Sequence, residues 1–557
     1  MRNIVKHLLS GCVTVLVLLL CNSCLEERIS SDYDGVTDNE TPSEDAYFSM
    51  SIDFGSIKKT LTRSVAIPQY DAGTPEENYV EKVRVLLYAF DSYYYTTTVV
   101  YAFDYNIRTR DSSDPLPLPG DPDQVGFTEY DVTTERYLYS SDDDYSFVTF
   151  ARKVKRQLYT VVVVVNPPAD MYTYTQKGGP YEYFYDQYGW ATDGVASVDA
   201  ADLRNRANSG WAADDYFLMT NHQGGFTMTP DKLQETEDAA NEYPVKIKVS
   251  RAVAKVSVLP ENTNLIPVTP VGANVTNLAW QLDITNKKSY RMRNMTYMLT
   301  DSGEMGAKEE YFQDDNQDDY FERELERRKY YYAKDPNFGY MDEYPYRHFS
   351  SFNGSNLTDR IAEFNYLEHT GGTNLTPTLA GSFGEWEYCL ENTVYPEDTY
   401  DDVITRVVVS CNYIPQLFAV GESYFMFDTY IFDVETMRDF VNGTGTLPDG
   451  LAQAILDAGI TAGNFNTMIS GAFETAGIKY FHNGINYYAI KIRHSNNSNN
   501  DDHSYGYYGV VRNNHYEITV TGIQGPGAPT VSEPEQGNMA SKINMLPWTE
   551  RKHSTVL

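Results

Sequence analysis

Short runs of apolar and aromatic residues, each about the length of a β-strand, recur along this chain and constrain its fold more than any other feature. In residues 46–54 the alternation is strict, because Phe48, Met50, Ile52 and Phe54 are separated by small or acidic residues. A period of two is typical of a strand with one buried face. Comparable runs lie at 80–91, 156–166, 216–221, 245–260, 277–285, 405–414, 424–432, 478–494 and 510–523. The pattern predicts an all-β fold.

Two segments between these runs have helical periodicity. In residues 433–443, Val434, Met437, Phe440 and Val441 are spaced as on one face of a helix, and residues 447–460 continue in the same way. No repeat of fixed period is present, which disfavours a solenoid or a propeller. We therefore predict two antiparallel β-sandwich domains in tandem with minor helical insertions.

Length and charge narrow the function classes. The 557 residues are enough for two or three domains. The chain has 44 Lys and Arg against 78 Asp and Glu, a formal net charge of −34. A field of that sign repels phosphate backbones, so the charge argues against nucleic acid as a partner.

The first 24 residues resemble an export signal that ends in a lipid-modified cysteine. Arg2 and Lys6 precede an apolar stretch at 13–20, which is too short to span a bilayer. Ser23 and Cys24 then follow a leucine-rich run, as in a bacterial lipoprotein cleavage box. We expect lipidation of Cys24; the alternative is an ordinary signal peptide with an incidental cysteine.

Motifs that would indicate an enzyme or a metal site were sought and not found. The chain has no HExxH, Walker-type glycine loop, GxSxG or CxxC motif. An acidic run at 314–325 has calcium-loop spacing at three positions but lacks the required Gly and Glu, so a solvated loop is favoured. His494, His503 and His515 flank an Asn-rich segment that is typical of an exposed connector. We predict no catalytic residues, no cofactor and no metal.

Two cysteines remain after the signal, and both lie in strand-like runs. Export to an oxidising compartment would permit a disulfide between Cys389 and Cys411. Buried free thiols are the favoured interpretation, and the pairing stays open from sequence.

Several segments, in matching order, resemble one family. The chain is similar to the fimbrillins, the fimbrial subunits of Bacteroidales that build type V pili, and among them to the shaft subunit of the minor, short fimbrium. The resemblance rests on TLTRSV (60–65), VEKVRVLLYAF (80–90), VSRAVAKVSV (249–258), YCLENT (388–393), GVVRNNHYEITVTGI (509–523) and LPW (546–548). YCLENT and GVVRNNHYEI are the most specific of these, since neither is a general β-protein motif.

This resemblance implies two tandem transthyretin-like sandwiches and a maturation route. The lipidated precursor would reach the outer-membrane surface, where a trypsin-like or arginine-specific protease would cut between Arg63 and Ser64. Strand residues Phe48, Met50, Ile52 and Phe54 would then be lost as a placeholder. The C-terminal tail of another copy would fill the groove through Ile543, Met545, Leu546, Trp548, Val556 and Leu557.

The implied partners are further copies of the chain, fimbrial anchor and tip subunits, the protease, and the outer membrane through the lipid. The expected domains are a signal peptide (1–23), a lipidated propeptide (24–63), an N-terminal sandwich (64–245), a C-terminal sandwich (246–523), and a Gly/Pro linker with the donor strand (524–557).

Alternatives remain open for each part. The first strand could stay in place, Arg28 or the pair Lys58 and Lys59 could be cut instead, and the tail could be an edge strand of its own domain. As a whole, the chain could instead be a fimbrial tip or accessory adhesin, or a monomeric surface lipoprotein that binds glycans with exposed Tyr and Trp.

Overall fold

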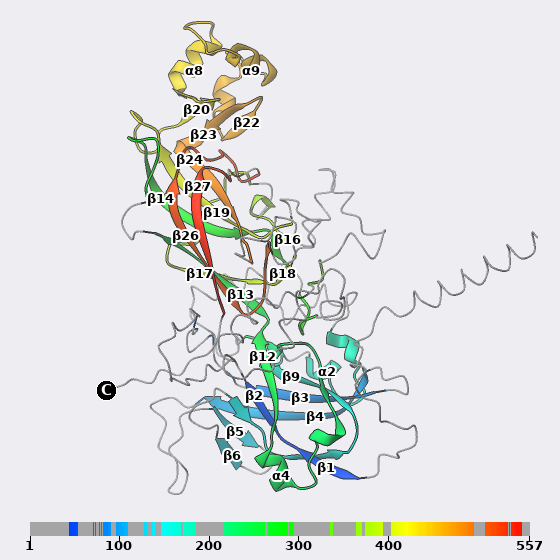
Figure 1. Ribbon diagram of the computed structural model, residues 1–557. Helices are drawn as coiled ribbons and strands as arrows, with labels where there is room; N and C mark the ends of the chain where they lie inside the picture. Colours follow the sequence, from blue (N-terminus) through cyan, green and yellow to red (C-terminus); the bar gives the residue numbers. More distant parts are fainter. Residues whose placement is uncertain are drawn as a thin grey trace, which may run out of the picture.

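A computed structural model of the chain describes, with short gaps, residues 44–53, 71–109, 127–184, 217–294, 333–337, 364–393, 403–494 and 507–547. Strands dominate these residues, and the helices are short. Figure 1 shows an N-terminal body, a C-terminal body, and a small head (residues 424–481) at the far end of the C-terminal body.

The N-terminal body is built on one large sheet. Its strand order is β6-β5-β4-β3-β9-β10-β12-β2-β7, and β11 also pairs with β9. β1 pairs with β8 in a separate two-stranded sheet. The neighbours are antiparallel except β2 and β12, which run parallel. The strands are β1 (Asp45–Phe48), β2 (Met50–Asp53), β3 (Lys82–Phe90), β4 (Thr96–Thr109), β5 (Phe127–Asp131), β6 (Arg136–Tyr139), β7 (Ser146–Val148), β8 (Arg152–Lys155), β9 (Tyr159–Val165), β10 (Met219–Asn221), β11 (Phe226–Met228) and β12 (Val245–Arg251).

β9 shows why this sheet is stable, because apolar side chains are buried on both of its faces. Val161, Val163 and Val165 pack in the same cluster as the side chains of β1 and β2. Val162 and Val164 pack on the opposite face, against residues of α2 (Met171–Tyr174) and η1 (Tyr181–Phe184). A strand covered on both faces is typically a continuous β-branched run, as this one is. Two further short helices, η3 (Pro230–Lys232) and α4 (Glu237–Glu242), precede β12.

The chain passes from the first body to the second at Ala252, between β12 and β13. The C-terminal body contains a sheet of order β17-β13-β26-β27 and another of order β14-β19-β24, and side chains of both form one core. β13 and β26 run parallel. The strands are β13 (Val253–Pro260), β14 (Asn274–Asp283), β17 (Trp386–Leu390), β19 (Arg406–Ile414), β24 (Ile485–Lys491), β26 (Asn514–Ile523) and β27 (Met539–Pro547). Two small pairs join β15 (Thr285–Asn286) to β16 (Phe364–Asn365) and β18 (Asn392–Thr393) to β25 (Gly509–Val510), and η7 (Leu367–His369) follows β16.

The head is inserted between β19 and β24, which pair with each other. It contains a sheet of order β21-β20-β23-β22 and its own apolar core. Its elements are β20 (Tyr424–Phe427), β21 (Tyr430–Asp433), α8 (Val434–Val441), α9 (Leu451–Asp457), α10 (Phe465–Met468), β22 (Phe473–Thr475) and β23 (Ile478–Phe481), and η8 (His482–Gly484) leads on to β24. α8 begins at an N-cap, where Asp433 Oδ1 accepts a hydrogen bond of 2.7 Å from the Thr436 amide. Both helices expected from periodicity are confirmed.

The predicted fold class, all-β with minor helical insertions, is confirmed. The domain limits given above stay predictions. Among the described residues, no helix combines the length and the apolarity needed to cross a membrane.

Candidate functional site

The first described strands lie inside the N-terminal body and have partners on both sides. β1 pairs with β8, and on its other side the backbones of Tyr47 and Gln234 exchange two hydrogen bonds of 2.8 Å. β2 lies between β12, which it meets in parallel, and β7, which it meets antiparallel. β2 is therefore an interior strand of this body, whereas β1 has a strand partner on one side and a single-residue bridge on the other.

The side chains of these strands are buried in the core. Phe48, Met50 and Ile52, three of the residues predicted for the placeholder strand, are at most 1% exposed. The ring of Phe48 lies 5.8 Å from the ring of Phe103. Ala46, which the sequence analysis left out, continues the same buried row. Its signal was the same alternation, extended one step toward the N-terminus.

The run at residues 46–54 is divided at Ser49 and is not one continuous strand. The side chain of Ser49 is buried, and its Oγ donates a hydrogen bond of 2.6 Å to the Ala240 carbonyl. The Ser49 carbonyl accepts from the Val245 amide at 2.9 Å. Thr149 holds the next residue, since its Oγ1 accepts from the Met50 amide at 2.9 Å and its own amide donates to the Met50 carbonyl at 2.8 Å. The segment thus leaves one sheet and enters another at Ser49.

The last described strand, β27, has a different environment. It pairs antiparallel with β26 and lies at the end of its four-stranded sheet. Met545 and Met539 are buried in the C-terminal core, while Ile543 and Leu546 are half-buried. In this structure the predicted donor residues Ile543, Met545 and Leu546 therefore lie in an edge strand of their own domain.

The segment between β26 and β27 is packed, although its Gly and Pro content predicted an open linker. The backbones of Tyr487 and Ala528 exchange hydrogen bonds of 2.8 and 2.9 Å, and the Gly527 amide donates to Asn486 Oδ1 at 2.7 Å. Val531 is buried. The expectation of an open linker is wrong for these residues, because their backbone groups have partners on or beside β24. The Gln524 amide donates a hydrogen bond of 2.7 Å to the Asn538 carbonyl, which closes this loop just before β27.

The remaining predicted site residues lie outside the described part of the chain. They are Cys24, Phe54, Arg63, Ser64, Trp548, Val556 and Leu557, together with His503 and the acidic run at 314–325.

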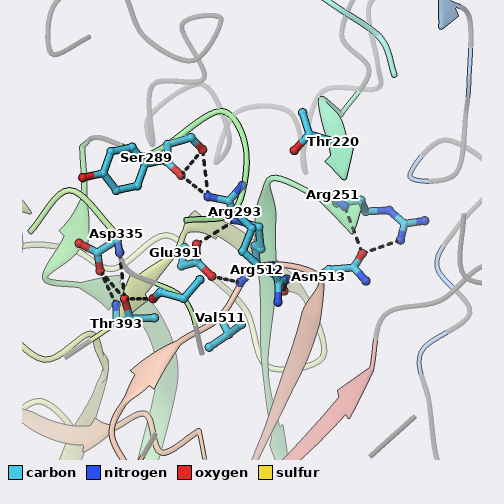
Figure 2. Close-up of polar contacts among 12 residues, drawn as sticks. Thr220, Arg251, Ser289, Arg293, Asp335, Glu391, Thr393, Val511, Arg512 and Asn513 are labelled. Carbon is cyan, nitrogen blue, oxygen red and sulfur yellow. Dashed lines mark hydrogen bonds and ion pairs between the residues drawn. The ribbon is translucent and has the colours of Figure 1, made fainter. Parts of the chain in front are cut away.

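A buried polar cluster lies where the two bodies meet, and sequence reasoning did not identify it (Figure 2). Arg512 Nε lies 2.9 Å from Glu391 Oε2, and both side chains are buried. Arg512 also donates to the Ser289 Oγ at 3.0 Å. Next to it, Arg251 of β12 donates to Asn513 Oδ1 at 3.2 Å. Glu391, Arg512, Asn513 and Arg251 belong to the segments YCLENT, GVVRNNHYEI and VSRAVAKVSV, and the contact between Arg251 and Asn513 joins the two bodies.

Cys389 and Cys411 are buried free thiols, as favoured from the sequence. Burial raises the pKa of the Cys411 thiol to about 12 and that of Cys389 well above its usual range, so neither is a ready nucleophile. His494 accepts or donates a structural hydrogen bond of 2.7 Å to the Tyr516 hydroxyl. In the described ranges no group of three His, Cys, Asp or Glu side chains is placed to hold a metal ion.

The C-terminal part of the chain matches a known family. Residues 479–554, from β23 to beyond β27, match the family described as Major fimbrial subunit protein type IV, Fimbrillin, C-terminal. This match confirms the resemblance to fimbrial subunits that the sequence predicted, and it fits a structural role in a fimbrium at the cell surface. No curated protein matches the chain.

Solved structures of low sequence identity are also similar to it. A protein from Parabacteroides distasonis, provisionally named for cell adhesion, has 12% identity and a TM-score of 0.39, with 91% of this chain and 99% of that one covered. Fimbrilin FimA from Porphyromonas gingivalis has 14% identity and a TM-score of 0.33, with 92% and 100% covered. The C-terminally truncated tip fimbrial protein Mfa3 from the same organism has 10% identity and a TM-score of 0.30, with 91% and 100% covered. These scores are low, and no property of those proteins is transferred to this chain.

Proposed function

We propose that this protein is a fimbrial shaft subunit that polymerises by strand exchange and has no active site. It is exported as a surface lipoprotein, lipidated at Cys24 and cut between Arg63 and Ser64. The cut releases β1 and β2, and the tail of another copy takes their place. One observation carries the proposal: β1 and β2, which lie upstream of Arg63, occupy an interior path with partners on both sides.

Loss of these strands would open a trough that invites another strand. β12 and β7 would each lose a backbone partner, and an unpaired strand edge is a template for pairing with another chain. Burial of Phe48, Met50 and Ile52 at about 1.5 to 3 kcal/mol each contributes about 5 to 9 kcal/mol gross. That range is comparable with the whole stability of a domain, about 5 to 15 kcal/mol, so the trough would not remain empty.

The tail has the pattern to replace them. Ile543 and Met545 alternate with Lys542 and Asn544, as expected of a strand with one apolar face. Pro547 cannot donate a ladder hydrogen bond, so the tail would bind as two short strands, with Trp548, Val556 and Leu557 in the second. In the uncut chain this tail is bound at an edge, from which it can leave without opening the core on both sides.

The proposed partners follow from this cycle. They are other copies of the chain along the shaft, anchor and tip subunits at its ends, an arginine-specific or trypsin-like protease, and the outer membrane until the lipidated segment is cut off. Having both a cleavable placeholder and a donor tail favours the shaft over the tip or anchor.

The decisive experiment is trypsin treatment of the purified precursor. We expect loss of residues up to Arg63, followed by a ladder of SDS-resistant oligomers on gels. A variant in which Lys58, Lys59 and Arg63 are all replaced by Gln is the matched control and should give neither, because trypsin cuts after lysine as well as arginine. A product that is trimmed but stays monomeric would favour the glycan-binding lipoprotein instead.

Deletion of residues 541–557 tests the donor role in the producing cell. The truncated subunit should be exported and cut but should form no surface fibres under the electron microscope. Fibres of normal length would show that the donor assignment is wrong.

A further inference from the structure

Two acidic residues in the segment that follows the proposed cleavage point, Asp71 and Glu77, contact side chains of the C-terminal body. Asp71 Oδ2 lies 3.0 Å from Lys255 Nζ and 2.9 Å from His515 Nδ1. The Gly73 amide donates to Asp71 Oδ1 at 3.0 Å and shapes the turn around the carboxylate.

Glu77 makes the second contact and is almost fully buried. Its Oε1 lies 3.1 Å from Lys255 Nζ and accepts a short hydrogen bond from the Tyr388 hydroxyl. Its backbone carbonyl accepts from Arg251 Nε at 3.1 Å.

The residues that receive these carboxylates form a row across three neighbouring strands. Tyr388 of β17 faces Lys255 of β13, and Lys255 faces His515 of β26. Lys255 Nζ also lies 4.5 Å from the centre of the Trp386 ring, which favours a cation at this position. A few residues further along the segment, Val80 is buried in the core of the N-terminal body, just before β3. Asp71 and Glu77 therefore contact the C-terminal body, while Val80 packs in the N-terminal body.

The charges of this row make the contact specific and costly to break. Burial alone would raise the pKa of Asp71, but the hydrogen bond from His515 and the charge of Lys255 hold it well below its usual range. Burial and the neighbouring Glu77 carboxylate raise the pKa of Tyr388, so its hydroxyl stays protonated and can donate. Removal of one member leaves a buried charge or carboxylate without its partner, which is more costly than loss of an exposed ion pair.

We propose that Asp71, Glu77 and Val80 form an interdomain clasp. Asp71 and Glu77 hold the new N-terminal segment on the C-terminal sheet after cleavage, so the loss of chain stops before β3 and the two bodies keep their arrangement. This rests on the proposed function for the cleavage step, whereas the clasp itself is a property of the uncut chain as well.

The test uses the full-length chain, before and after trypsin, with Asp71→Asn, Tyr388→Phe and the double variant. The glutamate-specific protease Glu-C is added, and cleavage within residues 64–81 is timed by mass spectrometry. Each single variant should be cut about tenfold faster than wild type, as expected for the loss of one charged hydrogen bond that closes a segment. The matched control is Asp104→Asn, which removes the partly exposed Arg84 to Asp104 pair in the N-terminal body and should not change the rate.

Tyr388→Phe removes one oxygen atom and keeps the packing, so it tests the clasp even if Asp71→Asn is poorly folded. Cleavage of both variants at the wild-type or control rate would overturn the clasp. If trypsin fails to release residues up to Arg63, the proposed function fails, but the Glu-C rates of the uncut chains still decide whether the clasp exists. Small-angle X-ray scattering of the double variant should show a broader range of distances between the bodies; an unchanged profile would contradict the claim that the clasp holds their arrangement.

Discussion

The first and last strands of the chain resemble each other in pattern and differ in how they are held. β2 has a strand partner on each side, whereas β27 pairs only with β26. Met50 of β2 is completely buried, whereas Met545 of β27 is 8% exposed and lies near the half-buried Ile543 and Leu546. The difference fits the opposite roles proposed for the two ends: release of the interior β2 would need a cut in the chain, whereas the edge strand β27 would leave its sheet with less disruption.

The largest expected effect comes from Met50→Ala in the uncut chain. It should lower the free energy of unfolding of the N-terminal body by about 3 to 5 kcal/mol, because the substitution leaves a cavity between strands that cannot collapse. Urea unfolding followed by circular dichroism measures it, with Ser51→Ala on the opposite face as the control. A loss no larger than that of Ser51→Ala would remove the basis for calling this path interior.

The corresponding substitution in the last strand, Met545→Ala, should lower the free energy of unfolding by a smaller amount. We expect about 1 to 2 kcal/mol for the C-terminal body, because an edge strand can relax toward solvent and fill part of the gap. Asn544→Ala, one residue away in β27, is the control. If Met50→Ala and Met545→Ala lower the free energy of unfolding equally, the contrast between the two strands disappears.

Acid should slightly reduce the stability that the ion pairs between β1 and β8 contribute. Hydrogen bonds from Lys153 and then Lys155 of β8 lower the pKa of Asp45 to about 2 from an ordinary value of 3.8. The stability that these pairs contribute is therefore fully present above pH 4 and is lost as the pH falls toward 2. The effect is small because the pairs are exposed. Urea midpoints of wild type and Asp45→Asn should differ at pH 5 and converge near pH 2; a difference that persists there would contradict the assignment.

The smallest effect is expected for Lys542→Gln in β27. Lys542 forms an exposed ion pair of 2.8 Å with Glu261, and such pairs contribute less than about 0.5 to 1 kcal/mol. Urea unfolding at low and moderate salt should show almost no change. A loss approaching that of Met545→Ala would mean that β27 is held by charge and not by its apolar face.

Local sequence patterns predicted the features that depend on residues close together in the chain. Alternation identified the buried side chains of Phe48, Met50 and Ile52, and helical spacing identified α8 and α9. Glu391 and Arg512 were missed because a buried ion pair joins positions 121 residues apart, and nothing near either residue reports its partner. The division at Ser49 was missed because alternation continues through it unchanged.

Turn-forming residues showed where the chain turns but did not show which strands pair or which loops are packed. His-Asn-Gly at 482–484, between two strand-like runs, is a turn signal that favours a hairpin. It does form a turn, with Asn483 at φ 54°, but β23 and β24 do not pair with each other. β23 joins the head and β24 joins the C-terminal body, so the turn links two sheets. The Gly and Pro content of residues 524–538 similarly did not reveal that their backbones are bonded beside β24.

The bend at Ser49 has a consequence for whatever occupies this path. The serine sits against the Ala240 carbonyl with no exposed surface, at the point where the peptide crosses from one sheet to the next. A larger side chain would collide there, so an incoming peptide needs a small residue at the crossing as well as apolar groups on either side. The size limit at this one position would therefore restrict which strand can replace β1 and β2 more strictly than a requirement for apolar side chains alone.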